Sequence, residues 1–441
     1  MKRSHLALVS FVAALLLTVP AVANTEGTAR SADGTPIHYL VDGAGEPALV
    51  FIHCWSCDAT YWDNQVPAFA AKHRVVRVDL AGHGSSGQQR TRYTLPAFGE
   101  DVKAVVEQEK LGKVILVGHS MGGDVMLEAA RLLPGKVLGL IAIDTLNDAS
   151  EKIDPKLLAE WQAAMEKDFP GFTKGFVRGM IPKDTDPALV EKIASDMASA
   201  PPAVARSAFA ELFAYDEAAG FRAAGAPILG INGTHFPTNV AGNNRFAPYD
   251  VTYQPKVGHF GMLEAPAEFN RLLAAAVERI ERGGTIMRTL RKEVEVKASL
   301  QDVWWAWTTV DGVKTFFAPD ARIELRPGGA YEMYFGPDQP VGQKGGEGCR
   351  VLSLLPMEMV SFEWNFPPSI PSLRTSGART WVVIQLTETA PGTVHVRLSQ
   401  LGWQPGKDWD KGFTYFDHAW GVVLQRLQRR FASGPLDWKT E

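Results

Sequence analysis

Residues 114–123 read Val114-Ile115-Leu116-Val117-Gly118-His119-Ser120-Met121-Gly122-Gly123, and this stretch decides the fold of the first part of the chain. Its four leading apolar residues predict a buried strand, and a helical stretch over 124–133 follows. The pattern G-x-S-x-G between a strand and a helix predicts a sharp turn that lifts the serine hydroxyl above the sheet. Ser120 is therefore the candidate nucleophile of this part of the chain.

Short apolar runs on both sides of this stretch alternate with helical segments. The runs are Ala48–Ile52, Val75–Val78, Val114–Val117, Leu138–Ile143 and Ile228–Ile231. Nearly continuous apolar strands separated by helices are typical of a mostly parallel, doubly wound α/β sheet with both faces covered. A helical insert over about 147–221 interrupts this alternation and is expected to form a cap.

A serine hydroxyl needs a base, and the base needs a group that orients it. His259 follows the strand-like segment Val251-Thr252-Tyr253 near the end of this region. A histidine placed after the last strand can fold over the turn that carries Ser120. We therefore predict that His259 is the general base, whereas His119 is expected to pack beside the nucleophile.

The region from about 35 to 282 resembles the α/β-hydrolase family. The motifs that carry the resemblance are Phe51-Ile52-His53-Cys54-Trp55, Asp79-Leu80-Ala81-Gly82-His83-Gly84, the turn from Gly118 to Gly122, and Gly258-His259. The resemblance implies acyl transfer to water without a cofactor or metal, because related enzymes of other chemistry carry aspartate in place of the serine. Esters, lactones or similar bonds of small apolar substrates are favoured, while carbon–carbon hydrolysis and cofactor-free haloperoxidase-like activity stay open.

The third member of the triad stands away from its usual place. In most relatives an acid follows the strand after the insert, but residues 221–249 contain neither aspartate nor glutamate. A family variant takes the acid from the end of the preceding strand, which here gives Asp144. We predict that Asp144 orients His259, with Asp148 in reserve; the alternative is that Asp144 only caps the segment that follows it.

The resemblance also implies an oxyanion hole formed by two backbone N–H groups, those of Met121 and Trp55. Relatives have His-Gly in the loop that carries the second donor, whereas this chain has His53-Cys54. Cysteine adopts positive φ less readily than glycine, so a different loop geometry is expected. Cys54 and Cys57 are expected to be either bonded or free thiols, and Cys349 has no evident partner.

The insert is rich in aromatic residues and methionine. These residues are Trp161, Met165, Phe169, Phe172, Phe176, Met180, Met197, Phe209, Phe213 and Tyr215. Such residues either line an apolar substrate pocket or bury the helices of the cap against one another, and the pattern does not separate the two.

The pattern changes near Arg282-Gly283-Gly284. One strand, helical segments, six successive strands and a long helix over about 409–431 predict a separate α+β domain over 285–441. It resembles the START-like SRPBCC superfamily with a helix-grip fold, and in particular activators of the heat-shock-protein ATPase. The motifs are Glu293-Val294-Glu295-Val296, Val303-Trp304-Trp305-Ala306-Trp307, Arg326-Pro327-Gly328-Gly329, Phe362-Glu363-Trp364 and Gly402-Trp403.

The resemblance implies an apolar cavity under the long helix, which gives this domain a possible hydrophobic ligand. Candidate lining residues are Trp307, Phe317, Trp364, Trp381, Trp403, Phe413, Phe416 and Trp420. Core packing is the alternative role for many of them. The glycine-rich segment from Gly342 to Gly348 is interpreted as a hairpin loop, because no helix start of the phosphate-binding type follows it.

The first residues have the layout of a cleaved secretory signal. Lys2 and Arg3 precede an apolar run from Leu6 to Val19, and Ala21-Val22-Ala23 forms a small-x-small site. We predict cleavage after Ala23, hence a periplasmic or secreted protein without a transmembrane anchor after cleavage. The domain boundaries are then 1–23 for the signal peptide, 24–282 for the hydrolase-like domain and 285–441 for the second. Export would also separate the second domain from a cytosolic chaperone.

Composition narrows the list of partners. The chain has 441 residues, with 45 Lys and Arg against 49 Asp and Glu, a formal net charge of −4. Because no run of like charges stands out, nucleic acid is not an expected partner. Two functions remain: an exported serine hydrolase with an appended ligand-binding domain, or a non-catalytic two-domain carrier of apolar compounds.

Overall fold

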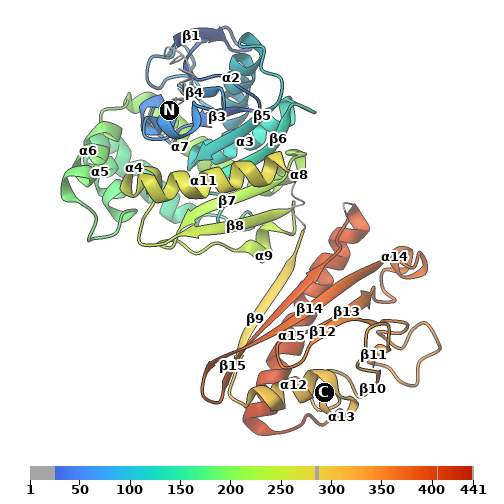
Figure 1. The fold of residues 1–441 in the computed structure, drawn as a ribbon. Helices are drawn as coiled ribbons and strands as arrows, with labels where there is room; N and C mark the ends of the chain where they lie inside the picture. The colour runs from blue at the N-terminus through green and yellow to red at the C-terminus, as the bar shows by residue number, and fades with distance from the viewer. Residues whose placement is uncertain (1–24, 284–287, 405, 440–441) are drawn as a thin grey trace, which may run out of the picture.

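The structure is a computed structural model that describes residues 25–283, 288–404 and 406–439. Figure 1 shows two separate units joined between the end of α11 (Pro266–Glu281) and the start of β9 (Leu290–Val296). The predicted signal peptide lies outside the described residues, as does part of the segment where the domain boundary was expected. None of the helices within the described ranges combines the length and apolar character needed to cross a bilayer.

The first unit is built on one sheet, whose described strands have the order β1-β2-β4-β3-β5-β6-β7-β8. Their bounds are β1 Thr25–Arg30, β2 Pro36–Asp42, β3 Ala48–Ile52, β4 Val75–Val78, β5 Val114–His119, β6 Val137–Ile143, β7 Ile228–Gly233 and β8 Tyr249–Gln254. β1 and β2 pair antiparallel, and all pairings from β4 to β8 are parallel. The predicted mostly parallel sheet is confirmed.

The central strands are buried along their whole length. Every residue of β3, β4, β5 and β7 is buried, so both faces of the sheet are covered. Helices α2 (Leu95–Gln108) and α3 (Met121–Leu132) pack on each other, and α11 packs against β6, β7 and β8. β1 and β2 were not among the predicted strands, since β1 (TEGTAR) has no apolar run and is held by its pairing with β2.

The predicted insert is a helical cap between β6 and β7 (Figure 1). Its helices are α4 Pro155–Lys167, α5 Phe169–Gly179, α6 Pro187–Met197, α7 Pro202–Ala214 and α8 Glu217–Ala223. Asp154, Asp168, Asp186 and Asp216 each accept a backbone hydrogen bond at the start of a cap helix. Short helical turns complete the unit: η1 Ala59–Trp62, α1 Val66–Phe69, α9 Val240–Asn243 and α10 Gly261–Glu264.

The second unit is an antiparallel sheet gripped by one long helix. Its strand order is β12-β13-β14-β15-β9, while β10 and β11 form a separate ribbon. The bounds are α12 Leu300–Thr308, α13 Val310–Val313, β10 Asp320–Ile323, β11 Tyr331–Tyr334, β12 Val351–Leu355, β13 Met359–Asn365, α14 Pro371–Thr375, β14 Arg379–Ala390, β15 Thr393–Leu401 and α15 Lys407–Ser433. α15 packs along β9, and the predicted helix-grip domain is confirmed.

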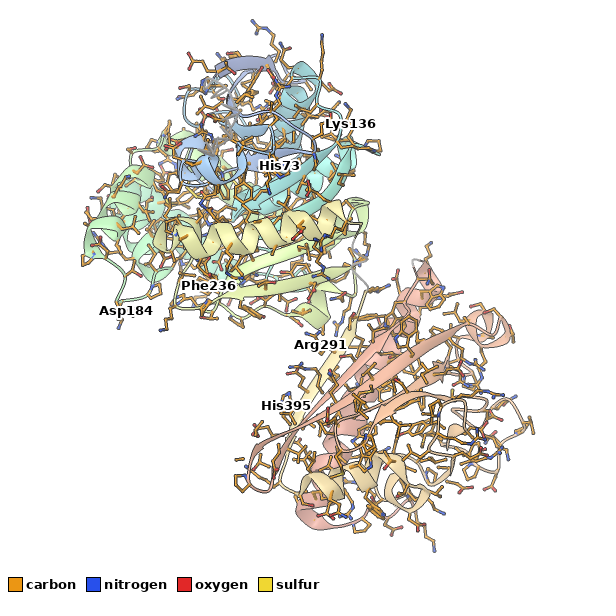
Figure 2. All side chains as sticks on the ribbon, in the orientation of Figure 1. His73, Lys136, Asp184, Phe236, Arg291 and His395 are labelled. Carbon is orange, nitrogen blue, oxygen red and sulfur yellow. A yellow bond between two sulfur atoms is a disulfide. The ribbon has the colours of Figure 1, made fainter. Side chains whose placement is uncertain are left out.

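The helical segments after β9 are divided at Thr309. This residue is extended (φ −121°, ψ 153°), and its side chain accepts a hydrogen bond from the Gly312 N–H at the start of α13. Strand β9 lies at one edge of the sheet and carries charged residues; Arg291 on β9 and His395 on the neighbouring strand β15 are labelled in Figure 2.

The two units touch through a small polar contact. Arg245, which follows α9, forms an ion pair with Asp417 of α15, and Asp417 also pairs with Lys292 of β9 at 2.8 Å. The Arg288 guanidinium pairs with Asp410 at 2.7 Å. The buried hydrophobic residues of the two units form two separate clusters, so the interiors of the units are distinct.

Candidate active site

The backbone at Ser120 forms a strained turn between β5 and α3. Ser120 has φ 52° and ψ −122°, a conformation that a residue with a side chain adopts only when its surroundings enforce it. A Cβ at Gly118 would lie 2.2 Å from the Gly122 carbonyl oxygen, and a Cβ at Gly122 would lie 2.5 Å from that of Ile52. Both glycines of G-x-S-x-G are therefore required by close backbone approach, as the motif predicted.

Asp144 and His259 meet beside this turn. His259 Nδ1 lies 2.6 Å from Asp144 Oδ2, and the Gly233 N–H donates to Asp144 Oδ1 at 2.8 Å. Burial raises the pKa of Asp144, but the hydrogen bond and the charge of His259 outweigh it, so the net pKa lies below its ordinary value. Asp144 is thus held as a carboxylate against the imidazole.

The end of β7, after which the family resemblance implied an acid, contributes a backbone group instead. Gly233 ends β7, and its N–H donates to the carboxylate of Asp144, which follows β6. Asp144 itself has φ 43°, a left-handed conformation that aspartate tolerates better than most residues. Asp148, the reserve candidate, bonds instead with Ser150 and Asn239.

Two neighbours hold the His259 backbone. His119 Nε2 donates to the His259 carbonyl oxygen at 2.8 Å, and the two ring centroids lie 4.7 Å apart. The His259 N–H donates to the carbonyl oxygen of Met180, at the end of α5 in the cap. Burial lowers the pKa of His119 to about 3, so this ring is neutral and packs, as its position beside Ser120 predicted.

The loop after β3 is pinned against the turn. Cys54 and Cys57 form a disulfide that brackets Trp55 and Ser56, and Ser56 has φ 57°. The His53 ring bridges this loop to the next strand connection, since Nδ1 donates to the Cys54 carbonyl at 2.7 Å and Nε2 accepts from the Leu80 N–H. The positive φ that the cysteine was expected to hinder falls on Ser56.

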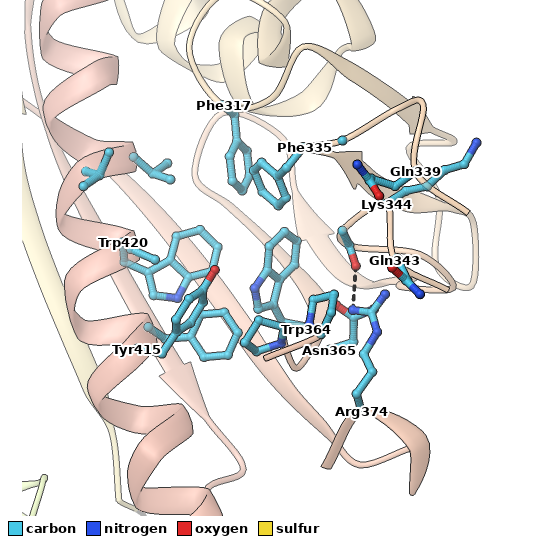
Figure 3. A pocket seen from close by; sticks show the side chains of 18 of the residues that line it. Phe317, Phe335, Gln339, Gln343, Lys344, Trp364, Asn365, Arg374, Tyr415 and Trp420 are labelled. Atoms are coloured by element: carbon cyan, nitrogen blue, oxygen red, sulfur yellow. Dashed lines mark hydrogen bonds between the residues drawn. The ribbon is translucent and has the colours of Figure 1, made fainter. Parts of the chain in front are cut away.

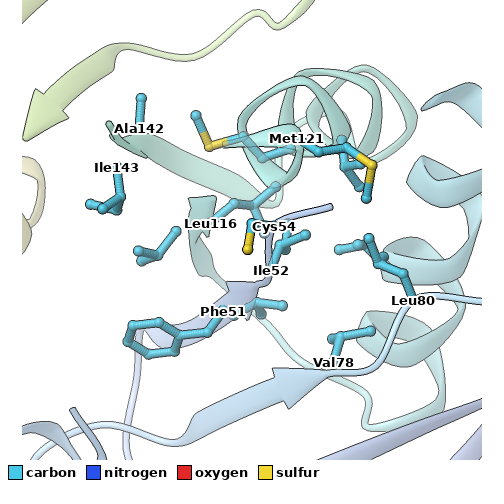
Figure 4. Close-up of a cluster of buried hydrophobic side chains, with 14 of the residues drawn as sticks. Phe51, Ile52, Cys54, Val78, Leu80, Leu116, Met121, Ala142 and Ile143 are labelled. Atoms are coloured by element: carbon cyan, nitrogen blue, oxygen red, sulfur yellow. The ribbon is translucent and has the colours of Figure 1, made fainter. Parts of the chain in front are cut away.

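Met121 and Trp55 occupy the positions predicted for oxyanion donors. A Cβ at Gly122 would also contact the His53 carbonyl oxygen at 2.7 Å, so the start of α3 and this loop abut. Within the described part of the chain, neither the Met121 nor the Trp55 N–H has a protein acceptor. Figure 4 shows Met121 and Cys54 in one buried cluster with Ile52 and Leu80.

A cavity of about 970 Å³ lies between the cap and the sheet. Thr145, one of its lining residues, donates to the Ser120 carbonyl oxygen at 2.9 Å, and Met180, another, holds His259. Its apolar walls contain Trp161, Phe172, Phe176, Leu212 and Phe213. The cavity therefore lies next to Ser120 and His259, although neither residue lines it.

The aromatic residues of the insert fulfil both of the roles left open by the sequence. Trp161, Phe172, Phe176, Met180, Phe213 and Tyr215 line the cavity, whereas Met165, Phe169, Met197 and Phe209 are buried in the core. The Trp55 ring contacts Phe169, Phe176 and Phe209, and its Nε1–H donates to the Ala205 carbonyl at 2.7 Å. The cap thus fixes the loop that carries the Trp55 N–H.

One wall of this cavity is acidic, a feature that sequence reasoning missed. Asp124 of α3 and Glu217 of α8 are buried against each other, and burial raises the pKa of both above the ordinary range. Asp148 and Glu151 line the same cavity, together with a single cation, Lys152. No sequence pattern joins Asp124 to Glu217, because the contact depends on how the cap folds back over α3.

The aromatic residues predicted to line the second cavity also divide. Phe317, Trp364, Phe416 and Trp420 line a cavity in the second unit, while Trp307, Trp403 and Phe413 are buried in its core and Trp381 lies outside that cavity. Among the described residues, no group of three or more His, Cys, Asp and Glu side chains has a metal-binding arrangement.

Comparisons with known proteins identify both units. Residues 47–180 match the family described as "alpha/beta hydrolase fold", and residues 297–432 match "Activator of Hsp90 ATPase homolog 1-like protein". The structure resembles an esterase from Exiguobacterium antarcticum with a TM-score of 0.52 at 20% identity, over 57% of this chain and 98% of that one. At this identity the likeness establishes the fold alone.

Two curated relatives illustrate the range of activities around this fold. One is the dihydrolipoyllysine-residue acetyltransferase component of the acetoin cleaving system of Pseudomonas putida, 35% identical over 35% of this chain and 40% of the relative. The other is 3-oxoadipate enol-lactonase 2 of Acinetobacter baylyi, 24% identical over 56% of this chain and 96% of the relative. The chain spans about half, or less, of the length of most curated relatives it matches.

Proposed function

We propose that this chain, in which an α/β-hydrolase domain is fused to a domain like the activator of Hsp90 ATPase, is an exported serine hydrolase of small apolar esters. The observation that carries the proposal is the 2.6 Å contact between His259 Nδ1 and Asp144 Oδ2 beside the strained turn at Ser120. Acyl transfer needs a carboxylate, an imidazole and a hydroxyl, which Asp144, His259 and Ser120 would supply.

In the proposed reaction, His259 Nε2 takes the proton of the Ser120 hydroxyl as Oγ attacks the ester carbonyl carbon. The resulting oxyanion accepts hydrogen bonds from the Met121 and Trp55 N–H groups. The imidazolium then gives its proton to the leaving alcohol as the carbon–oxygen bond breaks. Water repeats the sequence on the acyl-enzyme, releasing a carboxylic acid and restoring Ser120.

Asp144 serves this cycle as a fixed negative charge. It accepts the Nδ1–H of His259, which leaves Nε2 free to receive the serine proton, and it stabilises the imidazolium that forms. The lowered pKa of Asp144 supports this role, because the carboxylate stays ionised while the imidazole changes charge.

Ester-type bonds are the proposed substrate class. The cavity bordering Thr145 and Met180 has aromatic walls that suit an apolar acyl or alcohol group. The chain matches 3-oxoadipate enol-lactonase 2 over 96% of the length of that relative. A lactone is a cyclic ester, so the proposed steps would also open it.

Turnover of p-nitrophenyl esters with acyl chains of two to eight carbons tests the proposal. We expect the purified chain to hydrolyse at least one of them, and Ser120→Ala to lower kcat by roughly 10⁴-fold or more. Ser376→Ala in the second domain, with an unchanged melting temperature in both variants, is the matched control. Absence of hydrolysis across the panel by the folded wild type would overturn the proposal.

We also propose that the second domain binds an apolar ligand in the cavity lined by Phe317 and Trp364.

Export is the last element of the proposal and rests on residues 1–23. The Cys54–Cys57 disulfide supports it, since such bonds persist in oxidising compartments. Mass spectrometry of the protein recovered from a periplasmic fraction should give a chain starting at Asn24; an intact Met1 in the cytosol would contradict it.

A further inference from the structure

The cavity of the second domain is apolar at its floor and open at its rim. Its volume is about 510 Å³, and it lies between α15, β13 and the loop that follows β11 (Figure 3). Six of the lining residues are aromatic: Phe317, Phe335, Trp364, Tyr415, Phe416 and Trp420. The Phe317 and Trp364 rings are stacked with centroids 5.7 Å apart, so the floor offers flat faces to a ligand.

A largely buried indole borders this space. Trp364 is 3% exposed and lines the cavity, while the indole N–H groups of Trp420 and Trp403 donate to Gln400. Tyr415, which Figure 3 places beside Trp420, is 46% exposed. A ligand in the cavity can therefore contact the face of a ring that is itself held away from water.

The charges on the rim are of one sign. The described lining residues include the cations Lys344, Arg374 and Arg426, and no aspartate or glutamate. Among the described residues, none pairs with the Lys344 ammonium group. Lys344 lies on the glycine-rich loop that the sequence showed only as a hairpin. The loop therefore places the Lys344 ammonium group at the edge of an aromatic cavity.

Arg374, unlike Lys344, has a side chain that bonds to the protein itself. Its guanidinium donates to the carbonyl oxygens of Gly345 and Phe366 at 2.8 and 2.7 Å and pairs with Glu347 at 2.9 Å. These bonds hold the loop on which Lys344 lies. Burial lowers the pKa of both Arg374 and Arg426, because the rim partly removes water from their guanidinium groups.

We propose that this cavity binds an amphipathic carboxylate, with the apolar body against Phe317, Trp364 and Trp420 and the carboxylate at Lys344. The inference deepens the ligand-binding role proposed for this domain. It gives that role a ligand class which ester hydrolysis in the first domain also releases. The binding itself does not require the hydrolase to be active.

The test compares three probes that share one alkyl chain: dodecanoate and dodecylammonium, each below its critical micelle concentration, and dodecanol below its aqueous solubility limit. Isothermal titration uses the full-length protein, with Ala419→Trp, which fills the cavity from α15, defining the part of the binding that belongs to this site. We expect dodecanoate to bind this site roughly fivefold more tightly than dodecanol, the effect of one partly exposed ion pair, and dodecylammonium to bind most weakly.

Two substitutions locate the effect. Lys344→Gln should abolish the preference for dodecanoate over dodecanol, while Lys407→Gln, on the exposed start of α15, should preserve it. Trp364→Phe should weaken dodecanoate binding a few-fold, while Trp305→Phe, outside the cavity, should leave it unchanged.

Failure has two distinguishable forms. Equal or tighter binding of dodecanol at the site that Ala419→Trp blocks would overturn the carboxylate inference while leaving apolar ligand binding intact. Binding of no probe at that site would overturn the ligand role as well. Neither result would affect the ester assay, which reports on Ser120 alone.

Discussion

The two cavities of this molecule have similar walls and opposite charges. Six aromatic residues line each of them. Among the described lining residues, the cavity under the cap carries Asp124, Asp148, Glu151 and Glu217 with one lysine, whereas the second-domain cavity carries three cations and no acid. The aromatic residues suit both cavities to apolar groups. The charged residues distinguish the two cavities by the charge of the molecule that each would accept.

Under the proposed functions, this difference would place the two cavities at different stages of one reaction. An acidic wall favours neutral or cationic molecules and repels anions, and a basic rim does the reverse. Hydrolysis of a neutral ester would turn a molecule suited to the first cavity into an acid suited to the second. The proposals therefore pair a site that disfavours its own acidic product with a site that would accept that product.

The largest expected effect separates chemistry from ligand binding. Asp144→Asn should lower kcat by roughly 10³–10⁴-fold, because asparagine neither stabilises the imidazolium nor enforces the tautomer that leaves Nε2 free. Dodecanoate binding in the second domain should stay within twofold. Asp148→Asn is the matched control, and a comparable loss of kcat there would show that the wrong carboxylate has been assigned.

A smaller effect is expected from the loop that holds Trp55. Replacing both Cys54 and Cys57 by alanine should lower kcat about 10- to 100-fold with little change in KM, since a correctly placed oxyanion donor is worth about 3–4 kcal/mol. For so short a loop, the loss of unfolding free energy should be no more than about 2 kcal/mol. Cys349→Ala, at the buried thiol of the second domain, should leave kcat unchanged; an unaltered kcat in the double variant would show that the disulfide does not position the donor.

Charge selectivity in the ester assay tests the acidic wall directly. We expect kcat/KM for p-nitrophenyl butanoate to exceed that for the anionic p-nitrophenyl hemiglutarate by about tenfold, a repulsion of about 1.4 kcal/mol in a partly desolvated cavity. Asp148→Asn should narrow the ratio, because the pKa of Asp148 is lowered and this cavity-lining carboxylate is charged. A preference for the anionic ester would remove the contrast between the two cavities.

The smallest expected effect is on stability. Burial raises the pKa of Glu217 and Asp124, so the folded state holds protons that the unfolded chain releases. Their stabilising contribution is complete below the ordinary carboxyl range and is lost as pH rises through the raised pKa values.

The melting temperature of the first domain should therefore fall between pH 5 and pH 8, by about 2–4 °C for each kcal/mol. Glu217→Gln should flatten this decline, and Glu160→Gln on the exposed side of α4 should preserve it. A wild-type melting temperature that rises over the same range would contradict the raised pKa values.

The fold was predictable because its signals are local. The apolar runs that became β3 to β7 and the turn at Ser120 follow from short stretches of sequence. His259 was predicted from its position after the last strand-like segment, and the family resemblance supplied the displaced Asp144. The structure brings Asp144 and His259 together at 2.6 Å, while their catalytic roles stay a prediction.

What the sequence did not show depends on contacts between distant segments. Trp307 and Trp364 look alike in the sequence, yet one is core and the other lines a cavity, because only the curvature of the sheet under α15 decides which ring meets open space. Glu217 reaches Asp124 only after the cap closes over α3. Lys344 lies at the cavity because Arg374 donates a hydrogen bond to the carbonyl oxygen of Gly345, the next residue of the glycine-rich loop.

The central claim is that Ser120 is an activated nucleophile, and intact-protein mass spectrometry after exposure to a fluorophosphonate tests it most directly. We expect one adduct on the wild type, located by peptide mapping to Ser120, and none on Ser120→Ala. A folded wild type that stays unlabelled, or one labelled at another residue, would contradict the account.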